Sequence, residues 1–574
     1  MTVQFDPSAE QKAIIEAGLV SQRVIACAGS GKTATAVRRV AEIRRLMGAS
    51  RQFTALLAYS NVAVETFRAE YAALTAGRSH EANRVLICTV DSFITSQILS
   101  PHAQPVMQCA RRPYLVRGHE PFLKGFTFFN GSYGEDIRHL SATFDVSLGW
   151  QYFNANMRGN GASVATEIAT AAIKKLGAQG AYTHDLGRFW ALKTLAKSPH
   201  LVKVLAHRYP YILVDEAQDI GTVHGALIEL LIAAGSKVSL VGDPNQAIYD
   251  FANADGSFLR DFEPDIGGEK QTLTLNRRSI QPLVDVANRL GGTSYKSARL
   301  APSRKCGSFL ISYGDGDLAN IRSTFAALLA SHGYTNDSAA ILCRARDTVQ
   351  LIAGAGEKIG QGATRHFASA AICRDKKGDI ADAFSHVVDG VLRLLSTPPP
   401  TLRTAVLSGA DDQFVKTIRR LIWGFLRTSA TGLPISSHKA KSMWLPNLKA
   451  NLDLLLSSIE GGAGLARNPN WTRSVTVKEL ADAPLWKQDL ATLNVALPEV
   501  KTVHQSKGQS IDAVLYLLRP KEVGKVLAGP INEDGKIGYV GLTRAKDLLL
   551  LAVPSTTKLP LLNQLKAAGF TDWK

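Results

Sequence analysis

The sequence predicts an α/β protein built from two parallel-sheet cores, each of which carries an insertion. Three observations support this: the length of 574 residues, an alternation of short apolar segments with longer helical patterns, and two long interruptions of that alternation. At roughly 150 residues per domain, the length favours about four domains or subdomains. Apolar residues make up 45% and charged residues 20% of the chain, the balance of a folded globular protein.

Short β-branched or apolar segments separated by helical stretches predict parallel strands that are covered on both faces. The first expected set comprises residues 23–26, 55–59, 85–89, 212–215, 238–242 and 272–275. The second set comprises residues 308–312, 339–344, 513–517 and 548–553. Residues 96–179 interrupt the first set and residues 375–494 the second, and the latter segment has helical patterns joined by polar and proline-containing loops.

The charge balance points to a polyanionic partner. Lysine and arginine exceed aspartate and glutamate by 66 − 49 = 17, which favours nucleic acid or an anionic membrane surface. A merely basic soluble enzyme explains the charge alone equally well. No segment approaches the roughly 20 consecutive apolar residues that span a bilayer, and the first residues lack the features of a secretory signal. We therefore expect a cytoplasmic protein that does not act at membranes.

The six cysteines are scattered along the chain and form no C-x-x-C pair. This pattern gives no support to a disulfide scaffold, a structural zinc site or a four-cysteine iron–sulphur cluster.

A candidate phosphate-binding loop follows the first expected strand. The loop has the sequence Cys27-Ala28-Gly29-Ser30-Gly31-Lys32-Thr33 and precedes a helical segment at 34–44. Glycines let backbone N–H groups turn inward, the helix N-terminus adds positive potential, and Lys32 can reach the β- and γ-phosphates. The Thr33 hydroxyl is placed to bind Mg²⁺. The strict phosphate-loop pattern expects glycine at position 26, where this chain has alanine, and a chance small-residue loop is the alternative interpretation.

An acidic pair, Asp215 and Glu216, directly follows the expected strand at 212–215. Carboxylates at the C-terminal edge of a parallel sheet lie where such sheets bind ligands. We expect Asp215 to hold Mg²⁺ and Glu216 to orient and deprotonate the attacking water. A helix N-terminus enriched in acidic residues is the alternative interpretation.

Several further segments make the chain resemble the UvrD/Rep/PcrA-type superfamily 1 DNA helicases. In chain order, they resemble the Q motif (5–11), the phosphate loop (26–33), motif Ia (58–61), the next DNA-contacting motif (89–93), the segment before motif II (182–186), motif II (215–219), motif III (241–251), motif IV (276–279), motif V (503–508) and motif VI (539–545). That family's own phosphate loop has alanine at its first position, as here.

The resemblance implies two RecA-like cores with ATP and Mg²⁺ in the cleft between them. Core 1A then comprises residues 1–95 and 180–275, core 2A residues 276–374 and 495–574, and the mainly helical insertions 1B and 2B residues 96–179 and 375–494. The implied catalytic residues are Lys32, Asp215, Glu216, Gln246, Arg278 and Arg544. The implied nucleotide contacts are Gln11, Ala28, Gly29, Ser30, Gly31, Lys32, Thr33, Arg277 and Gly508, with Thr33 and Asp215 as metal ligands.

The resemblance also implies a track for single-stranded DNA and single-strand/duplex junctions. The implied DNA contacts are Tyr59, Ser60, Asn61, Thr89, Phe93, Tyr249, Phe251 and His504. Aromatic side chains suit such a track because bases of every kind stack on them. Packing in the core is the alternative for the aromatic residues, and a satisfied core histidine is the alternative for His504.

The chain departs from the family pattern at three places. Arg277 replaces the motif IV tyrosine that stacks on adenine, Gln509-Ser510 replaces the Leu-Glu of motif V, and Val62 replaces the lysine of motif Ia. Arg277 can stack on a base by cation–π contact, with less specificity than tyrosine. The 2B-like insertion is also shorter than in full-length repair helicases.

The resemblance implies an ATP-dependent DNA helicase or translocase that moves 3′→5′, with DNA repair or anti-phage defence as the expected setting. The alternative is a nucleotide-gated regulatory or interaction subunit with little unwinding of its own, similar to the helicase-like partner of an OLD-family nuclease in Gabija systems. An RNA helicase of related architecture is a third, less favoured hypothesis.

Overall fold

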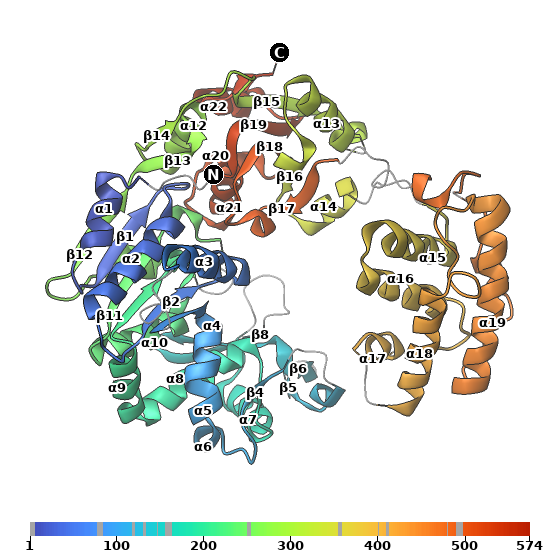
Figure 1. The fold of residues 1–574 in the computed structure, drawn as a ribbon, viewed down its shortest axis with the longest axis horizontal. Coiled ribbons are helices and arrows are strands. Elements are labelled where there is room, and N and C mark those ends of the chain that lie inside the picture. Colours follow the sequence, from blue (N-terminus) through green and yellow to red (C-terminus); the bar gives the residue numbers. More distant parts are fainter. Residues whose placement is uncertain are drawn as a thin grey trace.

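The computed structural model describes residues 6–76, 84–116, 121–129, 134–145, 147–154, 163–248, 254–318, 320–353, 359–399, 401–408, 412–478, 480–488 and 497–573. Figure 1 shows two sheet-containing bodies and a separate helical body. The first sheet lies at the left, the second at the top, and the helices of the chain's orange segment at the right.

The first sheet has six parallel strands in the order β12-β1-β11-β10-β2-β3. These strands are β1 (Gln22–Ala26), β2 (Thr54–Ala58), β3 (Val85–Thr89), β10 (Tyr211–Val214), β11 (Lys237–Gly242) and β12 (Glu269–Leu273). Its helices are α1 (Ala9–Glu16), α2 (Lys32–Met47), α3 (Asn61–Leu74), α8 (His184–Lys197), α9 (Pro199–Arg208), α10 (Thr222–Ala233) and α11 (Ser257–Asp261).

Both faces of this sheet are covered, because successive side chains of a strand point to opposite faces. In β2, Leu56 and Ala58 pack with α1, α2 and α3, whereas Ala55 and Leu57 pack with α8, α9 and α10. The near-continuous apolar strands of the sequence are therefore those of a parallel sheet that is buried on both sides.

The segment between β3 and α8 is mixed in secondary structure, which differs from the mainly helical insertion that we expected there. It contains α4 (Val90–Phe93), α5 (Ser100–His102), α6 (Gln104–Met107), α7 (Thr166–Ala178), β4 (Tyr114–Leu115), β5 (Thr127–Phe129), β6 (Gly134–Asp136), β7 (Leu140–Asp145), β8 (Gly149–Asn154) and β9 (Ala181–Tyr182). The β7–β8 hairpin forms because buried and partly exposed residues alternate along β7 and the Asp145 carboxylate accepts hydrogen bonds from two backbone N–H groups of the turn.

The second sheet also has six parallel strands, in the order β17-β16-β18-β19-β15-β20. These are β15 (Gly307–Tyr313), β16 (Ala339–Cys343), β17 (Glu499–Thr502), β18 (Ile511–Leu517), β19 (Ala545–Pro554) and β20 (Thr571–Asp572). Its helices are α12 (Gln281–Gly291), α13 (Ile321–Ser331), α14 (Arg346–Ala353), α20 (Val523–Leu527), α21 (Glu533–Leu542) and α22 (Leu559–Ala567). All ten expected strands overlap observed ones, while the edge strands β17 and β20 were not expected.

A short connection joins the two bodies. Strand β12 ends at Leu273, and Leu275 begins β13 (Leu275–Ile280), which pairs in parallel with β14 (Lys296–Arg299). Thr274 lies between them and donates its backbone N–H and its hydroxyl to the Glu10 carboxylate of α1. The chain thus crosses from one sheet body to the other through a single residue that is held by the first.

The helical body consists of α15 (Ala363–Ile372), α16 (Ile380–Leu392), α17 (Leu402–Ser408), α18 (Gln413–Arg427) and α19 (Leu445–Ala463). It has its own hydrophobic core, which includes the fully buried Trp444 and Phe367. This core begins at Ala363, ahead of the expected boundary at 375. The division of the chain into 1A, 1B, 2A and 2B therefore stays a prediction.

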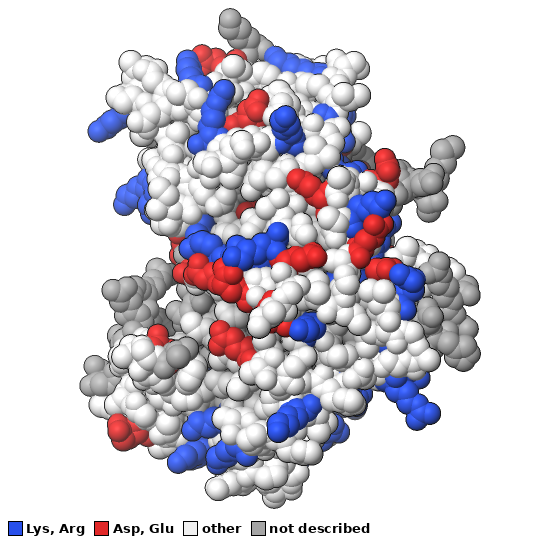
Figure 2. All heavy atoms as spheres, turned by 90° about the vertical axis from the view of Figure 1, so that its left-hand side faces the viewer, with Lys and Arg blue, Asp and Glu red and all other residues white. Residues whose placement is uncertain are grey.

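The two parallel sheets confirm the predicted α/β fold class with two sheet cores. Among the helices of the described ranges, none is both long and apolar enough to cross a membrane. Basic and acidic side chains are interspersed on the face that Figure 2 shows, which is the left-hand side of Figure 1. The overall positive charge is therefore not gathered into one patch on that face.

Candidate functional site

The predicted phosphate loop lies between the end of β1 and the start of α2. Gly29 and Gly31 have positive φ angles of 75° and 84°, which favour glycine. A Cβ atom at Gly29 would lie 2.4 Å from the Cβ of Arg278, so a side chain there would clash. The Arg277 backbone N–H donates to the Gly29 carbonyl at 2.9 Å. The loop is therefore in direct contact with the motif IV segment.

Gln11 supports the phosphate loop from behind. Its side-chain amide donates to the Ser30 carbonyl at 3.3 Å and to the Thr35 hydroxyl at 3.1 Å. Its side-chain oxygen accepts the backbone N–H of Ser8, which caps α1. Both ends of this amide are thus engaged within the protein, where the sequence predicts contact with adenine.

The acidic pair lies at the end of β10, at the carboxyl edge of the first sheet. Asp215 is 2% exposed, and Glu216 adopts a left-handed backbone conformation with φ of 51°, which is uncommon outside glycine. Burial and the adjacent Glu216 carboxylate raise the pKa of Asp215. Burial also opposes ionisation of Glu216, but the nearby Lys32 and Lys507 ammonium groups lower its pKa below the ordinary value.

A chain of amide side chains connects Glu216 to the motif III segment. The Gln218 amide donates to the Glu216 carboxylate, and the Gln218 oxygen accepts the backbone N–H of Asp243 at 3.0 Å. The Gln246 amide then donates to the Asp243 carboxylate at 2.7 Å. Gln246 is thereby fixed with its side-chain oxygen toward the second sheet body.

Two arginines lie opposite the phosphate loop and the acidic pair, in the cleft between the two sheet bodies. Arg278 belongs to β13, which follows the connection, and Arg544 directly precedes β19 of the second sheet. Arg544 is 1% exposed, and its Nη2 donates to Gln246 Oε1 at 2.8 Å. Arg278 Nη1 donates to the Thr543 carbonyl at 3.0 Å. Burial, followed by the proximity of Arg278, lowers the pKa of Arg544 to about 9. Burial likewise lowers the pKa of Arg278, and Glu216 opposes the shift. Two guanidinium groups therefore share one buried site beside the acidic pair.

Sequence reasoning missed Lys507 as a member of the cleft. Its ammonium group pairs with the Asp219 carboxylate and donates to the Gln246 carbonyl at 3.3 Å. The neighbouring Gly508 has a φ of 82°, and His504 Nε2 lies 3.3 Å from the Ile248 carbonyl oxygen. The segments that resemble motifs II and V contain Gln218, Asp219 and Lys507. Polar residues inside such a segment, to which no role had been assigned, could have indicated these further members of the cleft.

The donor set fits a triphosphate with Mg²⁺. The buried atoms Asp215 Oδ1, Ser30 Oγ and Arg278 Nε have no hydrogen-bond partner, although buried polar atoms are normally paired. A phosphate oxygen can accept from Ser30 and Arg278, and Mg²⁺ prefers carboxylate and hydroxyl oxygens such as those of Asp215 and Thr33. The site therefore combines hydrogen-bond donors that suit phosphate oxygens with carboxylate and hydroxyl oxygens that suit Mg²⁺. These groups come from the phosphate loop, the acidic pair and the two arginines.

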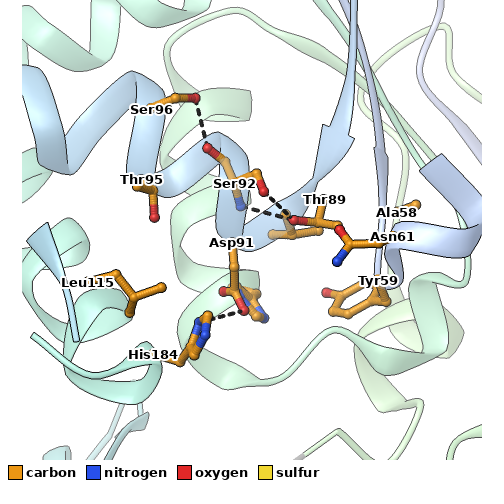
Figure 3. A pocket seen from close by; sticks show the side chains of 12 residues that line it. Ala58, Tyr59, Asn61, Thr89, Asp91, Ser92, Thr95, Ser96, Leu115 and His184 are labelled. Atoms are coloured by element: carbon orange, nitrogen blue, oxygen red, sulfur yellow. Dashed lines mark hydrogen bonds and ion pairs between the residues drawn. The ribbon is translucent and has the colours of Figure 1, made fainter. Parts of the chain in front are cut away.

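A second cavity of about 520 Å³ opens at the ends of β2 and β3. Its lining includes Tyr59, Asn61 and Thr89, three of the predicted DNA contacts, together with Asp91 and His224. In Figure 3, Asp91 lies between His184 and Tyr59, below the start of the helix that carries Ser92. The cavity thus brings motif Ia and the next motif together.

Asp91 is the electrostatic centre of this cavity. Arg188 of α8 donates to both of its carboxylate oxygens at 3.1 and 2.9 Å, and His224 Nε2 of α10 lies 3.2 Å away. Burial opposes its ionisation, but the hydrogen bonds from His224 and Arg188 hold the pKa of Asp91 far below its ordinary value. The His224 ring also packs edge-on against Tyr59, with ring centroids 5.8 Å apart.

The remaining predicted DNA contacts fall in different places. Ser60 caps α3 through a hydrogen bond from the Ala63 N–H at 3.1 Å. Phe93 is 3% exposed and packs against Tyr209 in the core, with centroids 5.2 Å apart. Tyr249 and Phe251 lie outside the described residues. Asp91, Arg188 and His224 were not predicted as site residues.

Residues 8–132 and 152–267 match the model of the UvrD/REP helicase N-terminal domain. The matched residues contain the phosphate loop, the acidic pair and the Asp91 cavity. This part of the chain is therefore similar to the N-terminal domain of UvrD/REP helicases. The predicted resemblance to superfamily 1 helicases of this type is thereby confirmed.

This UvrD-like chain also aligns with curated relatives over parts of its length. It is 38% identical over 96 residues to DNA helicase II of Escherichia coli (strain K12), covering 16% of this chain and 13% of that protein. It is 26% identical over 380 residues to the ATP-dependent DNA helicase UvrD2 of Mycobacterium tuberculosis, covering 60% and 47%. With RecBCD enzyme subunit RecB of Borreliella burgdorferi it shares 33% identity over 111 residues, covering 19% and 10%. The chain thus spans less than half the length of each of these relatives.

Proposed function

We propose that this chain is an ATP-driven translocase on single-stranded DNA that moves 3′→5′ and separates duplex ahead of it. One observation carries the proposal, namely that the second sheet body contacts the nucleotide site twice: Arg544 donates a hydrogen bond to Gln246, and Arg278 lies against the phosphate loop. ATP between these groups would contact both sheet bodies. Its binding and loss would therefore change how the two bodies are held together.

The roles of the residues follow from their positions. Lys32 would neutralise the β- and γ-phosphates, and Arg278 and Arg544 would stabilise the charge that spreads onto the γ-phosphate as the bond breaks. Glu216, ionised beside Lys32 and Lys507, would orient the attacking water and accept its proton. Bound Mg²⁺ would supply Lewis-acid stabilisation of the phosphate oxygens, with Asp215 and Thr33 as its protein ligands.

The cavity around Asp91 is the proposed contact with the DNA strand. It lies at the carboxyl edge of the same sheet as the nucleotide cleft, because β2 and β3 continue the order β1-β11-β10. Strand β10 carries the acidic pair and pairs with β2, which ends beside Tyr59. The acidic pair of the nucleotide cleft and the proposed DNA contact therefore lie at the ends of neighbouring strands. The proposed setting is DNA repair or anti-phage defence, in the latter case beside an OLD-family nuclease.

The decisive test measures ATP turnover with and without single-stranded DNA, alongside separation of duplexes that carry 3′ or 5′ tails. We expect turnover to rise with DNA and only the duplex with a 3′ tail to be separated. The Glu216→Gln variant should lose turnover but retain ATP binding, whereas Glu229→Gln, on an exposed position of α10, should keep both.

Other outcomes would contradict the proposal in distinct ways. DNA-stimulated turnover without strand separation would favour the regulatory or interaction subunit, and co-purification with a nuclease would then identify its partner. Stronger stimulation by RNA than by DNA would favour the RNA helicase. Unchanged ATP turnover in Glu216→Gln would contradict the assignment of Glu216 as the residue that activates the attacking water.

A further inference from the structure

The helical body contains a group of metal-ligand side chains that the nucleotide and DNA sites do not use. Cys373 Sγ, an Asp382 carboxylate oxygen and a His386 ring nitrogen all lie within 4.8 Å of one another. Cys373 begins the π-helical turn Cys373–Lys377 that follows α15. Asp382 and His386 are four residues apart on α16, so both side chains lie on the same face of that helix.

Two of the three distances within this group match the edges of a metal-centred tetrahedron, and the third is below 4.8 Å. Cys373 Sγ lies 3.3 Å from Asp382 Oδ2, and His386 Nε2 lies 3.7 Å from the same oxygen. Ligands that sit about 2.0 to 2.3 Å from a tetrahedral Zn²⁺ ion are separated from one another by about 3.3 to 3.8 Å. Both distances fall in this range.

The surroundings of Asp382 differ from those of its acidic neighbours. Asp375 pairs with Arg374 and Asp389 pairs with Arg403, whereas Asp382 faces the thiol and the imidazole. The Asp382 side chain is 54% exposed and that of His386 33%, while Cys373 is buried at 3%. An ion bound here would have the buried Cys373 thiol on one side and the partly exposed Asp382 and His386 on the other. Its fourth coordination position would then be accessible to water.

We propose that Cys373, Asp382 and His386 bind one tetrahedrally coordinated divalent ion of the Zn²⁺ type, with water as the fourth ligand. Binding replaces the proton of the Cys373 thiol, which leaves to solvent as the sulfur–metal bond forms. The ion fastens the turn after α15 to the first turns of α16 and so stabilises the helical body. This site does not depend on ATP or DNA. The cysteine spacing in the sequence gave no sign of it, because two of the three ligands are not cysteines.

The test is a titration of the untagged full chain, freed of metal by a chelator, with Co²⁺ followed by Zn²⁺. Tetrahedral Co²⁺ bound to a thiolate has a near-ultraviolet sulfur-to-cobalt band and visible bands that Zn²⁺ abolishes on displacing it. We expect these bands to saturate at one equivalent. Zn²⁺ should also raise the melting temperature of the chain, since it binds the folded state.

Matched variants make the assignment specific. Asp382→Asn and His386→Gln, at the exposed rim, should keep the fold and weaken binding by at least about tenfold, and Cys373→Ser should abolish the near-ultraviolet band. Asp389→Asn on the same helix and Cys306→Ser in the second sheet body should bind as the unaltered chain does. The proposal is overturned if the unaltered chain shows no sulfur-to-cobalt band at one equivalent, or if Asp382→Asn and His386→Gln bind Co²⁺ with unchanged affinity.

Discussion

The nucleotide cleft and the Asp91 cavity lie on one edge of one sheet, yet their charged groups are in opposite states. In the cavity, both oxygens of Asp91 are bonded, to Arg188 and to His224. In the cleft, Asp215 Oδ1, Asp219 Oδ1 and Arg278 Nε are buried without a hydrogen-bond partner. The Asp91 carboxylate is therefore fully paired within the cavity, although the Tyr59 hydroxyl there has no hydrogen-bond partner, whereas the cleft holds unpaired atoms of charged side chains.

This difference predicts that charged groups in the two regions affect stability in different ways. Completed pairs such as Asp91–Arg188 stabilise the fold, and removing one partner leaves a costly unpaired charge. Incomplete groups such as Arg278 cost stability in the absence of ligand and contribute only when an anion arrives. Substitutions in the two regions should therefore have distinguishable effects.

The largest effect is expected at Arg544. Arg544→Ala removes the guanidinium that reaches Gln246 across the cleft, and we expect ATP turnover to fall by about a thousandfold or more. Steady-state hydrolysis at saturating DNA is the measurement. Lys546→Ala is the matched control, since Lys546 pairs with Asp512 outside the cleft. Equal losses in the two variants would contradict the assignment.

A smaller effect, on stability, is expected at Asp91. Asp91→Asn leaves Arg188 and His224 without their shared carboxylate, and we expect the free energy of unfolding to fall by about 2 kcal/mol, measured by urea denaturation. The control is Asp185→Asn, because Asp185 also pairs with Arg188 but is 42% exposed, and exposed pairs contribute little. If Asp185→Asn destabilises as much as Asp91→Asn, the cavity is not organised around Asp91.

The pH dependence of stability should have opposite signs in the two regions. Burial raises the pKa of Asp219 to about 6 although Lys507 opposes the shift, while an unfolded aspartate titrates near about 3.9. The contribution of Asp219 to stability therefore falls as pH rises from about 4 to about 6. Asp91 has a lowered pKa, so its contribution is present above about 4 and is lost as pH falls through the lowered value.

Urea midpoints across this pH range check both signs. In the unaltered chain, Asp219 should make stability fall as pH rises from about 4 to about 6, and this fall should be absent in Asp219→Asn. Asp91 should make stability rise with pH in the acidic range, and this rise should be absent in Asp91→Asn. The same slope in both variants would show that the two carboxylates do not differ as described.

The smallest effect is expected at Arg277, whose side chain is exposed beside the half-buried Arg278. If Arg277 stacks on the base of ATP, Arg277→Ala should raise KM about fivefold at unchanged kcat, the equivalent of about 1 kcal/mol of cation–π contact. Arg277→Tyr should restore or exceed the original affinity. An unchanged KM in Arg277→Ala would show that the base is bound elsewhere.

Local patterns predicted much of the fold. Buried strands such as β1 and β10 are short, apolar and bounded by helical segments, so their existence and parallel pairing follow from the sequence. Strand β17 is half polar and lies at a sheet edge, where the hydrophobic pattern is weak. The β7–β8 hairpin alternates over only a few residues, which a helical expectation for that insertion overlooked.

The candidate site was predictable where a motif keeps its residues close in sequence, as in the phosphate loop. The Asp91 cluster could not be predicted, because Arg188 and His224 lie 97 and 133 residues further along the chain. Phe93 was predicted to contact DNA because of its place in a motif, but it is buried in the core. That Arg278 and Arg544 share one cleft followed from the family resemblance and not from any periodicity.

Thr274 has a mechanical consequence. It is the sole covalent passage from the first sheet body to the rest of the chain, and it adjoins the phosphate loop through β12, whose last carbonyl accepts the Cys27 N–H at 2.9 Å. Displacement under rotation grows with distance from the pivot, so a small angular change at Thr274 would sweep the remote α19 through a long arc. A rotation about Thr274, next to the proposed nucleotide site, would therefore produce its largest displacement in the helical body.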